Sequence, residues 1–289
     1  MRKRSLLLVA VLLLGLAGCH SSSTTPTIMA TTKPVYDLTD RLCRDTGLEV
    51  GLLIAESVSC LHDYSLNVSQ VRSAEAAQVI VTSGAGLEEF MEDILDGCDR
   101  LIDSSRDVPL LECTEEHEHE HEHEHEADAH IWLSPANAAI MAKNICDGLC
   151  GVFPEYGDTF RVNCSQLEEE LAGLQAYGET ALSSLSSREL VTFHDGFGYL
   201  AQAFDLTIAG AMEEESGSEA SAKELIALIT LVEAHQIPAI FTETSGSVSA
   251  AGIVSRETGV PVHTLDMGMS GDYFQIMRQN IDTLKEALG

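Results

Sequence analysis

The sequence predicts an α/β fold in which two lobes, each built on a parallel β-sheet, are joined by one long, rigid α-helix. Short apolar runs alternate with helical patterns in both halves of the 289-residue chain, and this alternation favours parallel sheets covered by helices on both faces. Between the two halves, leucines recur at helical spacing from Leu167 to Leu185, while the glutamates 168–170 take the solvent side. That pattern predicts one long amphipathic helix.

The first half of the chain begins with an apolar strand and a proline that is well placed to open a helix. Pro34 cannot donate a backbone hydrogen bond, and the first turn of a helix tolerates that loss. The β-branched run 79–83 is typical of a buried parallel strand. In this half we expect strands at 27–31, 48–55, 79–83 and 109–112, and helices at 34–44, 69–77 and 87–95.

The leucine-rich stretch predicts a helix over 155–185, roughly 45 Å long at 1.5 Å per residue. A helix of that length limits hinge closure between lobes, so we expect loop rearrangement in place of a wide hinge motion. After it, the alternation resumes. In the second half we expect strands at 190–193, 207–211, 239–242 and 262–265, and helices at 199–204, 220–234, 248–258 and 273–288.

The N-terminus predicts export. Three basic residues at 2–4 precede the apolar run 6–14, which is too short to be a convincing transmembrane span. The sequence Leu16-Ala17-Gly18-Cys19 then resembles the bacterial lipobox. That resemblance implies removal of the peptide before Cys19 and acylation of the Cys19 thiol, so we expect a chain anchored outside the cytoplasm by lipid alone.

The chain therefore divides into five expected segments. We place a lipoprotein signal peptide at 1–18, a flexible tether at 19–25, an N-terminal lobe at 26–150 with a His/Glu-rich loop at 112–128, a linking helix at 151–187 and a C-terminal lobe at 188–289. About 270 mature residues are enough for two domains of ordinary size.

The charge balance is strongly acidic. The chain carries 16 basic and 46 acidic residues, a formal charge of −30. Removal of residues 1–18 takes away three basic residues and no acids, which leaves −33. This balance argues against nucleic-acid binding, which needs a basic surface, and it suits an exported protein that works on cations.

A run of alternating histidine and glutamate occupies residues 117–126. Imidazole is the commonest protein ligand for zinc and related ions, and in an extended segment alternate side chains share one face. The run therefore indicates an auxiliary metal-binding loop, with a solvated charged loop without function as the alternative. Collection of metal and sensing of metal both remain open for it. Its histidines are His117, His119, His121, His123 and His125.

Single histidines outside the run suggest a preorganised site. His62, His130 and His194 come from both lobes and fall at strand ends or in loops, and Asp266 follows the last strand. Three imidazoles and one carboxylate form a closed tetrahedral set for zinc. We therefore place the metal site in the cleft between the lobes, where ligand sites of such folds tend to lie. The other two, His235 and His263, are interpreted as structural.

Four sequence blocks around these residues resemble one known family. The blocks are Leu61-His62-Asp63-Tyr64-Ser65-Leu66, Asp128-Ala129-His130-Ile131-Trp132-Leu133-Ser134-Pro135, Phe193-His194-Asp195-Gly196-Phe197-Gly198-Tyr199 and Leu265-Asp266. They are similar to the four metal-ligand motifs of the zinc/manganese solute-binding proteins of bacterial ABC transporters (cluster A-I). The resemblance covers essentially the whole mature chain, and the zinc members also carry a His-rich acidic loop where 117–126 lies.

The resemblance implies a ligand set of His62, His130, His194 and Asp266. Manganese members have Glu in place of the third histidine, so His194 favours Zn²⁺ over Mn²⁺ as the transported ligand. The turn after Asp266 differs from the family pattern, and a water molecule or Glu243 is the alternative fourth ligand. Asp63 and Asp195 are interpreted as partners that fix the imidazole tautomers.

The resemblance also implies a function without catalysis. It implies a monomeric extracytoplasmic protein that captures Zn²⁺ and delivers it to an ABC permease with its cytoplasmic ATPase. The alternatives are manganese transport, and a surface adhesin or metal buffer. A metallohydrolase is disfavoured, because the two His-Asp pairs lack an HExxH motif and a nucleophile elbow.

Seven cysteines follow Cys19. An odd number leaves at least one of them unpaired within the chain, and no pairing is assigned. The sequence contains no CxxC, so it does not predict a thiolate zinc site. The seven are Cys43, Cys60, Cys98, Cys113, Cys146, Cys150 and Cys164.

Overall fold

The computed structural model describes residues 26–55, 64–96, 98, 100–111, 127–212, 220–244 and 248–289. The signal peptide, Cys19, the tether, His62, Asp63 and the His-Glu run therefore lie outside the described residues. Within the described part, no helix is long and apolar enough to span a bilayer.

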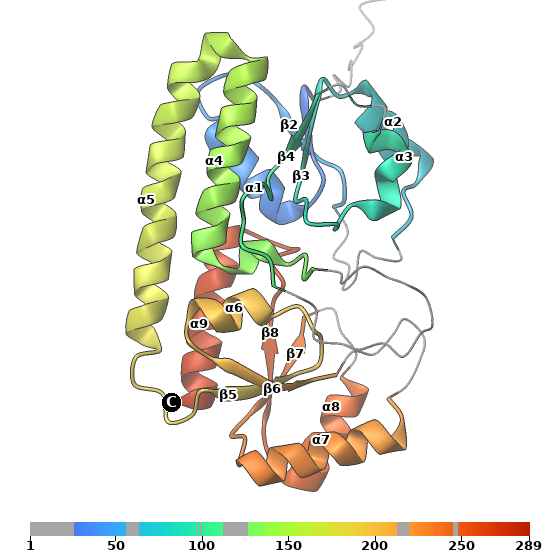
Figure 1. Ribbon diagram of the computed structural model, residues 1–289, viewed down its shortest axis with the longest axis vertical. Coiled ribbons are helices and arrows are strands. Elements are labelled where there is room, and N and C mark those ends of the chain that lie inside the picture. The colour runs from blue at the N-terminus through green and yellow to red at the C-terminus, as the bar shows by residue number, and fades with distance from the viewer. Residues whose placement is uncertain are drawn as a thin grey trace, which may run out of the picture.

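The N-terminal lobe is built on a parallel sheet in the order β2-β1-β3-β4 (Figure 1). Its core strands are short and fully buried, because β-branched and other apolar residues fill both faces of β1 and β3. The elements are β1 (Ile28–Ala30), α1 (Lys33–Leu42), β2 (Val50–Leu52), α2 (Val68–Ala76), β3 (Val79–Thr82), η1 (Glu89–Met91), α3 (Glu92–Leu95), β4 (Leu101–Asp103), η2 (Ile131–Leu133) and α4 (Pro135–Val152).

The C-terminal lobe repeats this topology, with a parallel sheet in the order β6-β5-β7-β8. In both sheets the chain therefore changes direction between the first and third strands. Ligand sites of such sheets lie beyond the carboxyl ends of the strands at that point. Its elements are β5 (Glu189–Thr192), α6 (Gly198–Ala203), β6 (Thr207–Ala211), α7 (Ala222–His235), β7 (Ile240–Glu243), α8 (Ser249–Thr258), β8 (Val262–Leu265) and α9 (Tyr273–Leu288), and η3 (Pro154–Tyr156) and α5 (Gly157–Ala181) connect the two lobes.

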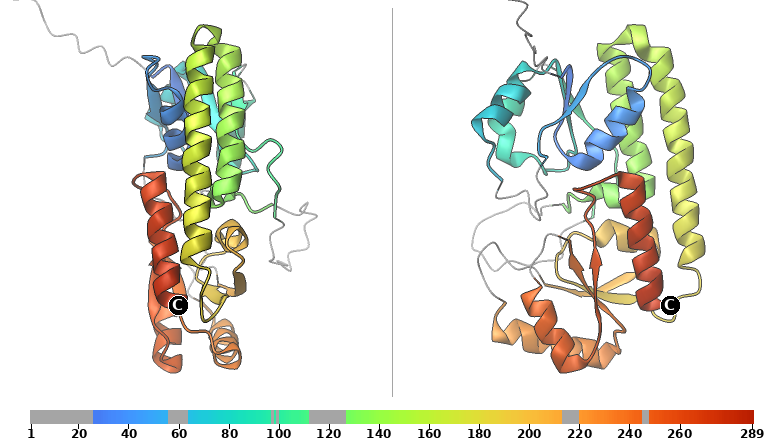
Figure 2. Two further views of the ribbon diagram at one scale, coloured as in Figure 1. Left: turned by 90° about the vertical axis from the view of Figure 1, so that its left-hand side faces the viewer. Right: turned by 180° about the vertical axis from the view of Figure 1, so that it is seen from behind.

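The long helix α5 runs beside both lobes (Figures 1 and 2). Its 25 residues span about 37 Å at 1.5 Å per residue. It packs against α1 and α4 of the first lobe and α9 of the second, and its buried face includes Leu167, Leu171 and Leu174. The predicted fold class, two parallel-sheet lobes with one long helix, is thus confirmed.

Several local expectations were wrong. The strand expected at 109–112 is absent from its described part, 109–111, where Leu110 is largely exposed. The edge strand β4 lies earlier instead, at Leu101–Asp103. The helix expected at 87–95 is split into η1 and α3. The long helix is shorter than 155–185, because it begins at Gly157 after a 3₁₀ turn and ends at Ala181.

The two lobes are joined by buried hydrogen bonds as well as by α5. The Trp132 indole N–H donates to the carbonyl oxygen of Met267 at 2.7 Å, and the Tyr273 hydroxyl donates to the Trp132 carbonyl at 2.7 Å. The backbone N–H of Tyr273 donates to Asp37 of α1 at 2.9 Å. Trp132 and Tyr273 are among the largest fully buried side chains, so these bonds are shielded from water and hold the lobes in one arrangement.

A buried carboxyl group fixes the turn after β3. Glu88 accepts hydrogen bonds from the Thr31 hydroxyl at 2.6 Å, the Ser83 N–H at 2.7 Å and the Gly84 N–H at 3.0 Å. Burial outweighs these bonds and raises the pKa of Glu88 to about 7, and the charge on Asp103 adds to the rise. Gly84 is the residue that the turn requires, because its φ is +80° and a side chain would collide with Asp103.

This raised pKa predicts a pH-dependent stability. The folded pKa of Glu88 lies above its ordinary value of 4.5, so its contribution is fully present below pH 4.5 and is lost as the pH rises through 7. The loss amounts to about 3 kcal/mol. The test compares the free energy of unfolding of the metal-free chain with that of its Glu88→Gln variant. The difference, unchanged chain minus variant, should fall by this amount between pH 4.5 and 8. Urea titrations at several pH values measure it. The exposed neighbour Glu89→Gln is the control, and parallel curves for Glu88→Gln and the unchanged chain would contradict the assignment.

Candidate metal site between the lobes

His130 is held by the loop that enters η2. The Asp128 carboxylate accepts the backbone N–H of His130 at 2.9 Å and lies 2.8 Å from its Nδ1. The Tyr199 hydroxyl in turn donates to the Asp128 carbonyl at 2.9 Å. A carboxylate on Nδ1 places the imidazole proton there and leaves Nε2 with its lone pair available for a metal ion.

His194 comes from the other lobe, directly beyond the end of β5. Its side chain is buried, with 6% exposure. Gly196 allows the loop to fold back over it, because an added Cβ at Gly196 would meet Nε2 of His194 at 2.8 Å and Cε of Met267 at 2.6 Å. His194 therefore sits where the change of direction between β5 and β7 leaves room for a ligand.

The two histidines meet across the boundary between the lobes. Their ring centroids lie 5.3 Å apart, and the rings are nearly perpendicular at 86°. The Trp132 ring lies against His130 at 5.5 Å, and the Phe197 ring lies 6.5 Å from His194. Two imidazoles so close together, backed by aromatic rings, form a partly dehydrated pair of nitrogen donors of the kind that zinc prefers.

Asp266 follows β8 and is already engaged by three donors. Its Oδ1 accepts the Gly268 N–H at 2.7 Å, and its Oδ2 accepts the hydroxyls of Thr244 at 3.2 Å and Ser270 at 3.3 Å. The Asn280 side chain pairs with both the N–H and the carbonyl of Asp266. The carboxylate is thus held in one orientation, and it retains acceptor capacity for a cation.

The alternative fourth ligand, Glu243, ends the neighbouring strand. It is 3% exposed and pairs in register with Leu265, next to Asp266. Two acidic side chains therefore lie at the carboxyl ends of adjacent strands. The choice between Asp266, Glu243 and water as the fourth ligand stays open.

Among the described residues, no three His, Cys, Asp or Glu side chains are grouped closely enough to hold a metal ion. The structure brings together two of the four predicted ligands, His130 and His194, and places Asp266 in a loop tied to the same region through Met267 and Trp132. His62 lies outside the described residues. The ligand set consequently stays a prediction.

Sequence reasoning missed the role of Asp128. It assigned the orientation of the imidazoles to Asp63 and Asp195, which each follow a histidine. Asp63 is outside the described residues, and Asp195 is partly buried beside His194. The contact with His130 comes from Asp128, two residues before it, and the Asp-x-His spacing was the signal that could have revealed it.

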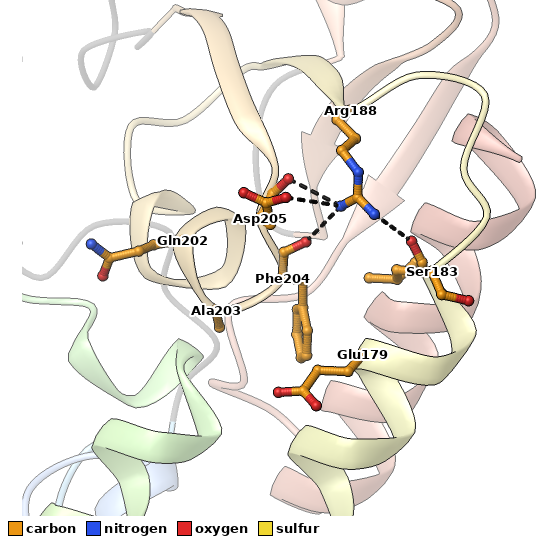
Figure 3. Close-up of a pocket in the computed structure, with 8 residues that line it drawn as sticks. Glu179, Ser183, Arg188, Gln202, Ala203, Phe204 and Asp205 are labelled. Atoms are coloured by element: carbon orange, nitrogen blue, oxygen red, sulfur yellow. Dashed lines mark hydrogen bonds and ion pairs between the residues drawn. The ribbon is translucent and has the colours of Figure 1, made fainter.

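The cavity drawn in Figure 3 lies where the chain leaves α5, between the end of that helix and the residues that end α6, and neither histidine lines it. It has a volume of about 430 Å³, and its one cation, Arg188, donates to the carbonyl oxygens of Leu182, Phe204 and Asp205 at 3.0–3.1 Å. Because those backbone carbonyls occupy the guanidinium, Arg188 clamps the end of α5 to α6 and is not an anion receptor.

The chain is similar to a known protein family over nearly its whole length. Residues 28–287 match the family described as the zinc-uptake complex component A, periplasmic. The chain is 30% identical over 308 residues to the zinc-binding lipoprotein AdcA of Streptococcus pneumoniae serotype 4, covering 99% of this chain and 61% of AdcA. It is 29% identical over 313 residues to the high-affinity zinc uptake system protein ZnuA of Bacillus subtilis, covering 98% and 97% respectively.

Solved structures show the same architecture. A crystal structure of ZnuA superposes with a TM-score of 0.80 at 25% identity, covering 91% of this chain and 98% of that one. The laminin-binding protein Lmb of Streptococcus agalactiae superposes with a TM-score of 0.79 at 20% identity, covering 91% and 100%, and that likeness shows the fold alone. The chain belongs to the family of periplasmic zinc-uptake components A, which are solute-binding proteins.

Proposed function

We propose that this chain captures Zn²⁺ outside the cytoplasm and delivers it to an ABC permease that works with a cytoplasmic ATPase. The observation that carries the proposal is the pairing of His130 and His194 across the lobe boundary, with Asp128 fixing the His130 tautomer. Relatives described as zinc-binding or zinc-uptake proteins support zinc as the cargo. Capture and delivery of an ion neither form nor break a covalent bond, so the proposed role needs no catalytic group.

The proposed ligands are His62, His130 and His194, with Asp266, Glu243 or a water molecule in the fourth position. Three neutral imidazoles favour zinc over manganese, which prefers oxygen ligands. Acylation of Cys19 is the proposed membrane anchor, supported by the lipobox-like sequence and by the lipoprotein description of AdcA. We further propose that the chain acts as a monomer.

Metal content tests the site and the His-Glu run together. We expect the mature chain lacking residues 115–127 to retain one tightly bound zinc ion per chain, and the complete mature chain to bind more than one. The additional sites should be weaker than the tight site. Native mass spectrometry and competition with a zinc chelator measure both quantities. If both forms bind the same number of zinc ions, the His-Glu run does not bind metal. If deletion of the run abolishes tight binding, the tight site lies in the run.

Growth separates transport from the other roles. A deletion strain should grow poorly when zinc is scarce and recover when zinc is added in excess, whereas loss of an adhesin or a metal buffer would leave zinc-limited growth unchanged. Complementation by the chain without residues 115–127 then shows whether the run is needed for uptake.

A further inference from the structure

Three cysteines lie together where α4 and α5 form a helical hairpin. Cys146 and Cys150 are one turn apart on α4, and Cys164 is near the start of α5. Cys146 lies close enough to both Cys164 and Cys150 for the three thiols to influence one another's pKa. The Sγ of Cys164 also lies 4.0 Å from the carbonyl oxygen of Ala142, one turn before Cys146, so the two helices hold these thiols side by side.

The three thiols differ in exposure. Cys146 and Cys164 are buried, with 3% and 7% exposure, whereas Cys150 is partly exposed and donates to the Gly157 carbonyl at 3.6 Å. Since no described cluster of His, Cys, Asp or Glu has the arrangement of a metal site, metal binding does not explain the grouping. Adjacent thiols of unequal exposure are suited to thiol–disulfide exchange, in which the accessible thiol reacts first with an external disulfide and then passes the bond to its buried neighbours.

We propose that Cys146, Cys150 and Cys164 form a thiol–disulfide exchange site that stores a Cys146–Cys164 disulfide between α4 and α5, with Cys150 as its entry point. The family is periplasmic, and exported compartments allow disulfides to form and persist. The three cysteines lie in the half of each helix nearest the turn between α4 and α5, the two long helices that run side by side in Figure 1. The stored bond would tie the long helix to the first lobe.

The disulfide forms in three thiol–disulfide exchange steps. The Cys150 thiolate attacks a small-molecule or protein disulfide, forms a mixed disulfide and releases one thiolate. Cys146 attacks the Cys150 sulfur and releases the second thiolate of the oxidant. Cys164 then attacks the Cys146 sulfur and returns Cys150 to its reduced form. In total two electrons pass to the oxidant, which is reduced to two thiols, and the protons of Cys146 and Cys164 end on them.

Geometry favours the last step. In the Cys146–Cys150 disulfide both sulfurs belong to one helix, and attack by Cys164 exchanges that less favourable bond for one between the two helices.

Oxidised glutathione applied to the reduced mature chain tests the site. Peptide mapping should find a Cys146–Cys164 disulfide, with Cys150 still available for alkylation. The bond closes a short loop, so the thermal midpoint should rise by about 5–10 °C. Cys150→Ser should slow formation of the bond at least about 10-fold and leave the product unchanged, while Cys98→Ser, at a partly exposed position, should leave the rate unaltered.

Two results would overturn the proposal. A stable glutathione adduct on Cys150, with Cys146 and Cys164 both still alkylated, would show that the buried pair does not exchange. Formation of the bond at an unchanged rate in Cys150→Ser would show that Cys150 is not its entry point. The mapping on the unsubstituted chain needs no variant, so the first result is independent of any folding defect.

Discussion

Replacing His194 by alanine should weaken zinc binding by about 100-fold or more, because loss of even an outer partner of a metal ligand costs 10–100-fold. His194 is buried against His130, with ring centroids 5.3 Å apart, and Gly196 folds the loop over it. Removal of the His194 imidazole leaves His130 as the one remaining nitrogen donor of the pair. Competition with a chromophoric chelator at pH 7.5 measures the change.

His235→Ala provides the matched control for this experiment. His235 ends α7, is about half exposed and pairs with Glu189 at 3.2 Å. Its loss removes one imidazole from the chain without touching the lobe boundary, so the affinity should stay unchanged. Circular dichroism of both variants verifies that they fold. A folded His194→Ala chain with unaltered zinc affinity would refute the proposed site.

Replacing Trp132 by alanine should lower the free energy of unfolding by about 3–5 kcal/mol. The Trp132 side chain is 1% exposed, lies against His130 and donates to the Met267 carbonyl. The substitution therefore leaves a cavity and an unpaired buried carbonyl at the same place. For a chain of this size the thermal midpoint should fall by roughly 10 °C or more.

A second substitution separates packing from hydrogen bonding at this position. Trp132→Phe keeps most of the ring and loses the N–H, so we expect about 1–3 kcal/mol, the cost of one unsatisfied buried group. The exposed α5 position Val162→Ala is a control for which a change within about 0.5 kcal/mol is expected. Thermal denaturation followed by circular dichroism measures all three. Equal losses for Trp132→Phe and Trp132→Ala would mean that packing contributes little.

The elements with strong local signals were predictable from the sequence. The strand predicted at 262–265 and the helix predicted at 273–288 match β8 and α9. A short run with β-branched residues is typical of a strand, and a long amphipathic pattern is typical of a helix. The helix α4 was not predicted. Its sequence is rich in Ala, Gly and Cys, and its exposed side holds only two charged residues, Lys143 and Asp147, so the polar stripe on which periodicity depends is weak.

The candidate site was predictable only in part, for a related reason. Histidines can be counted in a sequence, and their positions after strands predicted that some of them would meet. Which carboxylate supports an imidazole depends on how the loop turns, and the short link from Asp128 to His130 is a property of that turn. The left-handed backbone at Gly268, which brings the Met267 carbonyl to Trp132, is likewise decided by tertiary contact.

The helix α5 has a consequence for the timing of the proposed cargo's release. It packs on α1 and α4 of the first lobe and on α9 of the second, so spontaneous separation of the lobes would break its contacts with α9 and the buried hydrogen bonds that Trp132 and Tyr273 make across the boundary. Unaided dissociation of a bound ion should therefore be slow even when its equilibrium affinity is moderate. Unloading would then depend on a docking partner that displaces the loops carrying His194 and Asp266. The time for which the cargo stays bound would be set by the rate at which that partner docks.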